Sequence, residues 1–355
     1  MWPARKERRT LARRVLACLA ILTGLAVTAR PQAPARQAPS PGLRAEEVKF
    51  EGAGLKLAGT LLLPEPGADK RAPAVLVVGD SGPTTRDGSP GVAAGNGTYR
   101  VIAEYLAARG FVVLRYDKRC VGASECRPAS PFDAYVDDAR GALAYVRSRR
   151  EVDPARVAVF GHGEGGLLGS IAAAHDPAVK AVVLAAAPGR TAGKLIREQV
   201  QRRLAAAGRP AEETQAYLAK YDRVIAGLTS GKADFTDEKI DPGDAVLTNL
   251  IKQRDFTIPL LVNDPLQIVT AVEAPVLVLQ GEKDLEVGVR DAQYLGEALK
   301  RAHHADPTVH LLPDVDHLLK TDTGPTSVRA DEDATRPVDP MLLKLLSEWL
   351  QTKLR

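Results

Sequence analysis

The chain has 355 residues, of which 45% are hydrophobic, 26% charged and 5% aromatic, a composition that is typical of globular proteins and unlike disordered or fibrous chains. Its formal net charge is +4, but residues 1–29 hold six basic residues and one acidic residue, a net +5, so the remaining residues carry −1. This near-neutral balance argues against nucleic acid or an anionic membrane surface as the partner.

The first 29 residues are predicted to be a signal peptide. A basic start precedes an apolar run over residues 15–29, and Val27-Thr28-Ala29 provides the small residues of a cleavage site. Cleavage there would leave 326 of the 355 residues in the periplasm or outside the cell, with no membrane contact. The run is shorter than the roughly 20 residues of a spanning helix, and an uncleaved anchor is the alternative. In an oxidising compartment, Cys120 and Cys126 predict a local disulfide, with a free thiol as the other reading.

Short apolar runs alternate with helical segments along most of the chain. Residues 30–45 are rich in Pro, Ala and Arg and predict a disordered linker. Strands are expected at 48–50, 55–63, 74–79, 111–116, 156–160, 181–186, 275–280 and 309–312, and helices at 99–109, 132–149, 167–174, 289–301 and from 341. Continuous runs such as VLVV and FVVL are typical of strands covered on both faces, so the pattern predicts an α/β fold with a mostly parallel sheet and flanking helices.

The alternation stops between residues 189 and 270, where apolar residues recur at helical spacing among many charges. This interruption predicts a helical cap inserted between two parts of one sheet. The expected organisation is a signal peptide at 1–29, a linker at 30–45, the first part of the core at 46–188, the cap at 189–270 and the second part of the core at 271–355.

The sequence GHGEGG at residues 161–166 lies between an expected strand and an expected helix. It satisfies the dinucleotide pattern G-x-G-x-x-G, but no acidic residue occurs at 184–189, about twenty positions on, where that motif requires one. It also fits the nucleophile elbow G-x-S-x-G, in which a sharp turn lifts a serine above the sheet. The nucleophile position is then Gly163. No cofactor is predicted, and no histidine pair has a zinc-site spacing, so no metal is predicted either.

Taken together, the motifs resemble the α/β-hydrolase family, in particular its exported esterases and acyl hydrolases related to dienelactone hydrolase and the prolyl-oligopeptidase group. The resemblance covers about residues 48–350. It rests on DSGPTTRDG at 80–88, RYDKRCVGAS at 115–124, GHGEGG at 161–166, PVLVLQGEKDLEV at 275–287 and LLPDVDHLL at 311–319. It implies the α/β-hydrolase fold and a small ester or acyl substrate.

The resemblance also implies roles for individual residues. The family order is nucleophile, acid, histidine, which assigns Asp284 as the acid and His317 as the base, with Gly163 at the nucleophile position where the serine is missing. The oxyanion hole would use the backbone N–H groups of Ser81 and Glu164.

Several side chains around these positions depart from the family pattern. The resemblance leads us to expect Gly at 80, Gly at 120, Ser at 163 and often Asn at 316, whereas this chain has Asp80, Cys120, Gly163 and Asp316. Two of the departures add negative charge near the expected oxyanion, which opposes its stabilisation.

Four other side chains are candidates for the role of the missing serine. Ser170 lies too far along its helix, nothing places a base beside Ser81 or Ser124, and Cys120 would serve only if reduced. His317 held by Asp284 could instead activate water, with Gly163 leaving room for it. Two hypotheses therefore stay open, a hydrolase of carboxylic esters or related acyl compounds, and a non-catalytic relative that binds a small ligand or a protein partner.

Overall fold

The structure is a computed structural model that describes residues 40–65, 71–88, 97–174, 176–231, 240–304, 306–326 and 336–355. The predicted signal peptide and residues 30–39 of the predicted linker lie outside this part of the chain. The end of the linker that is described already contributes Arg44 and Ala45 to the first strand. In the described ranges, no helix combines the length and the apolar character that a membrane span requires.

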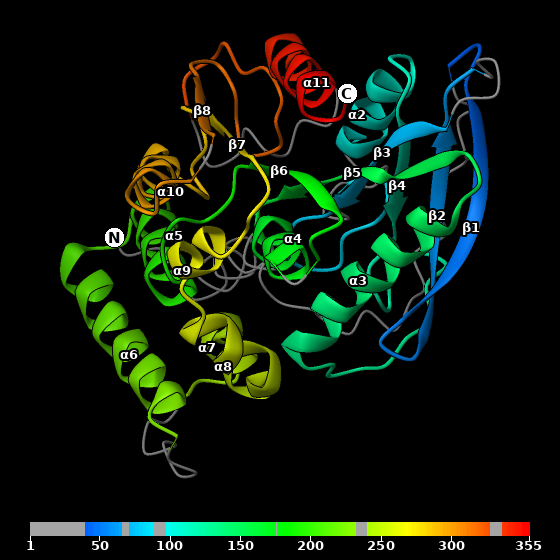
Figure 1. The fold of residues 1–355 in the computed structure, drawn as a ribbon. Coiled ribbons are helices and arrows are strands. Elements are labelled where there is room, and N and C mark those ends of the chain that lie inside the picture. The colour runs from blue at the N-terminus through cyan, green and yellow to red at the C-terminus, as the bar shows by residue number, and fades with distance from the viewer. Residues whose placement is uncertain are drawn as a thin grey trace.

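In the part of the chain that the structure describes, eight strands form one sheet in the order β1-β2-β4-β3-β5-β6-β7-β8 (Figure 1). The first two strands pair antiparallel with each other, and β2 pairs antiparallel with β4, whereas the remaining pairs are parallel. The strands are β1 (Arg44–Gly52), β2 (Leu55–Leu63), β3 (Ala72–Val78), β4 (Val112–Tyr116), β5 (Val152–His162), β6 (Val179–Ala185), β7 (Val276–Gly281) and β8 (Pro307–Leu312). The predicted mostly parallel sheet is confirmed.

Helices cover both faces of the sheet, as the unbroken apolar runs require. On β5, Val157 and Val159 face one hydrophobic cluster, and Ala158 and Phe160 face the other. Figure 1 shows α2 and α11 on one side of the sheet and α3 and α4 on the other. The helices of the core are α2 (Thr98–Ala107), α3 (Phe132–Ser148), α4 (Glu164–Ala174), α10 (Val289–Arg301) and α11 (Pro340–Lys353).

Between β6 and β7, the chain forms helices that pack mainly on one another. They are α5 (Ala192–Ala206), α6 (Ala211–Thr229), α7 (Ala245–Lys252), α8 (Arg254–Val262) and α9 (Pro265–Thr270). Residues of α5 to α8, such as Ile196, Leu218 and Leu247, form a third hydrophobic cluster separate from the two that cover the sheet. The short α9 packs instead on α4 and α10. Helices α5 to α9 are called the cap below, and residues of α5 and α8 lie beside Asp80, Gly163 and His317, which follow the carboxyl ends of β3, β5 and β8.

Candidate active site

The residues expected to be acid and base lie side by side where the last two strands end. Asp284 follows β7, His317 follows β8, and both side chains are buried. His317 Nδ1 hydrogen-bonds to Asp284 Oδ2 at 2.9 Å. Asp284 also accepts hydrogen bonds from the backbone N–H groups of Glu286 and Val287, each at 2.8 Å. The carboxylate is thereby fixed, and it orients the imidazole with Nδ1 protonated and Nε2 directed away from it.

The turn between β5 and α4 has the shape of a nucleophile elbow. Gly163 has a φ of +54°, in the left-handed region, and α4 begins directly after it at Glu164. A Cβ atom at Gly165 would lie 2.3 Å from the carbonyl oxygen of Val78, so glycine is needed for the helix to approach β3. The helix starts three residues before the predicted start. The prediction missed the first turn because it consists of Glu and glycines, and the apolar residues begin only at Leu167.

The carboxylate of Asp80, on the loop after β3, occupies the space next to Gly163. A Cβ atom built on Gly163 would lie 1.9 Å from Asp80 Oδ1, which is an overlap. Asp80 Oδ2 lies 3.0 Å from His317 Nε2, the atom that would face a serine hydroxyl in a hydrolase triad. The room that the sequence analysis assigned to a water beside Gly163 is thus filled by the side chain of Asp80.

The backbone donors expected to form an oxyanion hole are directed at the same carboxylate. The N–H group of Glu164 donates to Asp80 Oδ1 at 3.1 Å, and the backbone N–H of Ser81 also stabilises the Asp80 carboxylate and lowers its pKa. The structure therefore brings Ser81, Glu164, His317 and Gly163 together, as the resemblance implied, but around a carboxylate of the chain itself.

The charges of this cluster follow from its contacts. Burial alone would lower the pKa of His317, but the carboxylates of Asp284 and Asp80 outweigh it and raise this pKa well above the usual value. Burial alone would raise the pKa of Asp80, but His317 outweighs it and this pKa falls far below its usual range. His317 is therefore an imidazolium that donates both N–H groups, and in this arrangement it cannot accept a proton from water.

A buried chain of hydrogen bonds runs beneath the site and was not foreseen from the sequence. The backbone N–H of Asp80 donates to Tyr99 Oη at 2.8 Å, Tyr99 Oη lies 2.8 Å from His162 Nδ1, and His162 Nε2 lies 2.7 Å from the carbonyl oxygen of His317. A carbonyl only accepts, so His162 carries its proton on Nε2, and Nδ1 accepts from the phenol. Burial lowers the pKa of His162, which keeps the ring neutral. The chain joins the loops that carry Asp80 and His317.

Lys118 supports the site from the loop after β4. Its Nζ donates to the carbonyl oxygen of Asp80 at 2.6 Å and lies 3.0 Å from Glu164 Oε1, in an ion pair whose side chains are 5% and 10% exposed. From the sequence, Lys118 is expected to take part in a structural ion pair beneath the loops and not to be a ligand, and the pair with Glu164 agrees with this. Its contact with Asp80 follows from the parallel pairing of β3 and β4, which places the loops after these two strands side by side.

Asp80, His162 and His317 each offer a ligand atom within 4.8 Å of the others, an arrangement that could hold a metal ion. In this structure the atoms are engaged with one another and with Tyr99, because His317 Nε2 donates to Asp80 and both nitrogens of His162 are hydrogen-bonded. A cation would have to displace the proton on His317 Nε2 and the phenol on His162 Nδ1. With their ligand atoms occupied by hydrogen bonds, Asp80, His162 and His317 do not fit a metal ion in this arrangement.

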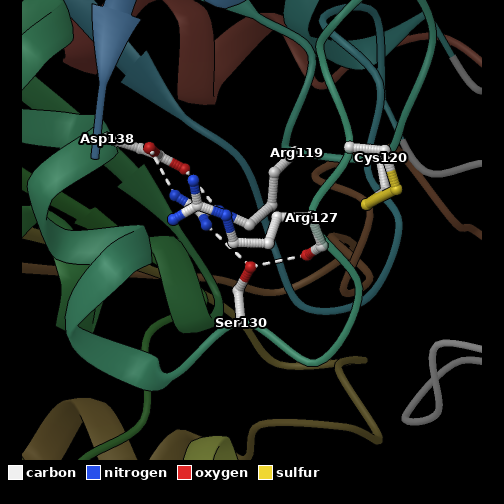
Figure 2. Close-up of a disulfide and its surroundings, with 6 residues drawn as sticks. Arg119, Cys120, Arg127, Ser130 and Asp138 are labelled. Atoms are coloured by element: carbon white, nitrogen blue, oxygen red, sulfur yellow. Dashed lines mark hydrogen bonds and ion pairs between the residues drawn. A yellow bond between two sulfur atoms is a disulfide. The ribbon is translucent and has the colours of Figure 1, made fainter. Parts of the chain in front are cut away.

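Cys120 and Cys126 form a disulfide on the loop after β4 (Figure 2). The same figure shows Arg119, which is nearly fully buried and donates to both carboxylate oxygens of Asp138 at 2.9 and 2.7 Å, and to Ser130 Oγ at 2.7 Å. With its sulfur bonded to Cys126, Cys120 has no thiolate to act as a nucleophile. The disulfide and the Arg119 contacts instead fasten the loop that carries Lys118.

The remaining serine candidates are buried or already hydrogen-bonded elsewhere. Ser170 is buried in α4, and Ser124 Oγ is engaged by the carbonyl oxygen of Asp117 and the backbone N–H of Ala58. Asp316, whose charge was expected near the oxyanion, is paired with Arg336 at 2.5 Å. Its charge is therefore balanced behind the site.

A pocket of about 720 Å³, part of it open to solvent, lies above the cluster. Asp80, Gly163 and His317 form its floor, and the cap provides its mainly apolar walls, with Leu195, Ile196, Gln199, Leu260 and Pro265 among them. A site with apolar walls and a few convergent polar groups at the carboxyl ends of the strands suits a small, largely uncharged ligand.

The sheet order, the turn at Gly163 and the paired Asp284 and His317 at the strand ends define the α/β-hydrolase fold. Comparison with known proteins agrees with this class. Residues 89–231 match the family described as serine aminopeptidase, S33. The chain is 26% identical over 281 residues to the esterase EstD of Thermotoga maritima, a match that covers 78% of this chain and 62% of that protein. The quorum-quenching protein AidA of Acinetobacter baumannii is 34% identical over 110 residues, 28% of this chain and 36% of AidA.

Solved structures show the same fold over a larger part of the chain. An esterase of Pyrococcus furiosus superimposes with a TM-score of 0.57 at 16% identity, covering 94% of this chain and 99% of that one. The chain therefore has the α/β-hydrolase fold and is similar in sequence to an esterase. It spans less than two thirds of the length of the curated relatives named above.

Proposed function

We propose that the protein is a hydrolase of carboxylic esters or related acyl compounds, with His317 and Asp284 as the catalytic pair. The observation that carries this proposal is their 2.9 Å hydrogen bond at the floor of an apolar pocket beneath the cap. The names of the esterase relatives support the acyl substrate class. The apolar walls favour a short, uncharged ester.

Ester hydrolysis requires the Asp80 side chain to rotate away from the backbone donors. The carbonyl oxygen of a substrate gains negative charge when its carbon is attacked, and it would need the N–H groups of Ser81 and Glu164 that now hold Asp80. Rotation also takes a carboxylate away from His317 Nε2, so the imidazolium can release its proton and accept one from water. Water then attacks the acyl carbon beside Gly163, and the leaving alkoxide takes the proton back from His317.

The test is hydrolysis of p-nitrophenyl acetate and butyrate by the purified chain and three variants. Asp80→Ala frees the donors and lowers the pKa of His317, so we expect faster hydrolysis. His317→Gln removes the base and should abolish it. Asp316→Asn is the matched control, because Asp316 lies outside the pocket, pairs with Arg336 and keeps an oxygen to accept from the Lys320 N–H; its rate should not change. Activity that is absent in the parent chain and in Asp80→Ala would exclude the proposal.

The second candidate is a protein that binds a ligand in the pocket without hydrolysing it. The filled oxyanion donors and the missing serine favour it. It predicts saturable binding of short-chain acyl compounds by calorimetry, unchanged in His317→Gln and with no turnover in any variant above.

The protein is further proposed to act in the periplasm or outside the cell. The basic and apolar pattern of residues 1–29 supports export, and the Cys120–Cys126 disulfide supports an oxidising compartment. Mass spectrometry of the chain recovered from the periplasm and the medium tests this, since the mature protein should begin at Arg30.

A further inference from the structure

The loop that follows Asp284 lies between this carboxylate and the cap. Residues 285–287 form neither helix nor strand, so their backbone groups need partners from elsewhere. The N–H groups of Glu286 and Val287 donate to Asp284 Oδ1, each at 2.8 Å. The carbonyl oxygens accept from side chains, and two of those side chains belong to helix α5 of the cap.

Three side chains of α5 contact this loop. Gln199 Nε2 donates to the carbonyl oxygen of Glu286 at 3.0 Å, and Arg202 Nη1 donates to that of Leu285. Arg203 Nη2 pairs with Glu286 Oε1 at 2.6 Å, and the two side chains are 11% and 16% exposed. Positions 199, 202 and 203 are three and four residues apart, so these side chains share one face of the helix. Their contacts with the loop are called the α5 clamp below.

We propose that Arg202 and Arg203 are positioning residues for Asp284, so that the cap holds the acid of the catalytic pair in place. This inference rests on the proposed hydrolase and adds a part of the cap to its machinery. Without the clamp, the loop would move and Asp284 Oδ1 would lose its two backbone donors. The carboxylate would then turn away from His317 Nδ1, which it contacts at 2.9 Å. An imidazole without this partner is no longer held in the tautomer and orientation that proton transfer requires.

The core holds the other oxygen of Asp284 and one end of the loop. Gln280 is fully buried, and its Nε2 donates to Asp284 Oδ2 at 3.0 Å and to the carbonyl oxygen of Val287 at 2.8 Å. Leu285 and Glu286, in contrast, are held by the α5 clamp. The surroundings of Oδ2 are therefore set by the core, whereas those of Oδ1 depend on the cap.

The segment that leads into α5 is fixed to the far end of the same loop. Asp291, in the first turn of α10, is fully buried and accepts from the N–H groups of Gly288 at 3.1 Å and Gly189 at 3.0 Å. It also pairs with Arg190 at 2.7 Å. A Cβ atom at Gly189 would lie 2.2 Å from the carbonyl oxygen of Asp291, so this contact is a close one. The helix therefore starts from a fixed point beside the loop that it holds.

One helix thus carries both a wall of the pocket and the clamp. Leu195, Ile196 and Gln199 line the pocket, whereas Arg202 and Arg203 do not belong to the described residues that line it. Replacing either arginine therefore loosens the loop without removing a group that meets the substrate. We expect kcat to fall while KM changes little.

The experiment compares Arg203→Met, Arg202→Met and Arg203→Lys with the parent chain by proton NMR, with ¹⁵N-labelled histidine. The signal measured is the Nδ1–H of His317, which is identified by its loss in His317→Gln. Both methionine variants should shift this signal upfield or broaden it by exchange with water, because the hydrogen bond to Asp284 weakens. Arg203→Lys should keep it, since an ammonium group can still pair with Glu286.

Arg197→Met is the matched control. Arg197 lies on the same helix and pairs with Asp222 of α6 at 2.8 Å, with both side chains more than a third exposed. The variant loses an arginine of α5 and leaves the clamp intact, so the His317 signal should not change. His304, whose Nε2 lies 3.0 Å from the carbonyl oxygen of Val272, shows in the same spectra whether each variant is folded.

The kinetic measurement is hydrolysis of p-nitrophenyl butyrate. Arg203→Met should lower kcat about 10- to 100-fold, and Arg203→Lys should recover most of that loss. A His317 signal that is unchanged in both Arg203→Met and Arg202→Met would overturn the proposal, as would an equal change in Arg197→Met. Failure of the hydrolase is distinguishable from this: if no chain hydrolyses the ester and the His317 signal still changes as expected, α5 positions Asp284 and only the ester activity is excluded.

Discussion

The side chain of Asp80 fills the space that a side chain at position 163 would need. The carboxylate of Asp80 stands where the first side-chain atom of residue 163 would lie, at 1.9 Å from a Cβ built there, and it contacts the histidine that a serine at 163 would face. The carboxylate of Asp80 and a side chain at position 163 therefore exclude each other. Their effects on stability and activity should not be additive.

Gly163→Ser alone is expected to destabilise the protein by about 1–3 kcal/mol, because the added atoms overlap the buried carboxylate. It should not create a serine hydrolase. Asp80→Gly together with Gly163→Ser opens the space, and the double variant should regain the lost stability and react with a fluorophosphonate at position 163. Urea denaturation and labelling of the two single variants and the double variant measure this. A single Gly163→Ser variant that is as stable as the parent and is labelled would contradict the overlap.

The stability of the protein should depend on pH through His317. Its pKa is raised on folding, so the folded state keeps a proton that the unfolded state loses above about pH 6.5. The stabilisation is complete below that pH and declines as the pH rises toward the pKa of the folded state. The pKa of Asp80 is lowered on folding, so its contribution is present above about pH 4 and is lost in acid.

Urea denaturation from pH 4 to pH 10 measures this profile in the parent chain and in His317→Gln. The variant should lose the alkaline decline, and the contribution of Asp80 should weaken because His317 no longer lowers its pKa. An identical decline in both proteins would show that His317 is not an imidazolium in the folded state.

Lys118→Met should destabilise the protein by about 3 kcal/mol, because it leaves the nearly buried Glu164 carboxylate without its partner. Lys118→Met with Glu164→Gln removes both charges and should recover much of that loss. The free energies of unfolding of these two variants, of Glu164→Gln alone and of the parent chain form a double-mutant cycle. Equal losses in the single and double variants would mean that the Lys118–Glu164 ion pair, 3.0 Å long, contributes little.

Replacing both Cys120 and Cys126 by serine should lower the free energy of unfolding by less than the about 3 kcal/mol expected of a fifteen-residue loop, because this loop is shorter. Ester hydrolysis should remain, since neither sulfur is available in the disulfide. Reduction of the parent chain with dithiothreitol is the parallel measurement. Activity that appears only after reduction and is lost in Cys120→Ser would make Cys120 the nucleophile.

Gln199 is expected to select substrates that carry a hydrogen-bond donor. Its Nε2 donates to the carbonyl oxygen of Glu286 at 3.0 Å, and among the described residues its buried Oε1 finds no partner, although the residue lines the pocket. Gln199→Met should therefore raise KM about tenfold for a hydroxyalkyl ester and leave the alkyl ester of equal length unaffected. Equal effects on both esters would show that Oε1 does not meet the substrate.

The sequence by itself determined the fold class, because buried parallel strands need unbroken apolar runs and covering helices need a regular apolar face, and both patterns are local. It also placed Asp284 and His317 after the correct strands, since the family order follows the order of the strands. The early start of α4 escaped it, because glycines in the first turn carry no apolar period and the turn is held by contact with β3.

Only the tertiary structure decided what stands between His317 and Gly163. In the sequence, Asp80 and Gly163 are two separate departures from the family pattern, and only the overlap between the Asp80 carboxylate and a Cβ at position 163 links them. The hydrogen bond between Asp80 and His317 joins residues 237 positions apart in the sequence. The hydrogen bond between Tyr99 and His162 joins residues 63 positions apart. No local pattern records such distances, because they arise where parallel strands bring the ends of distant segments to one edge of the sheet.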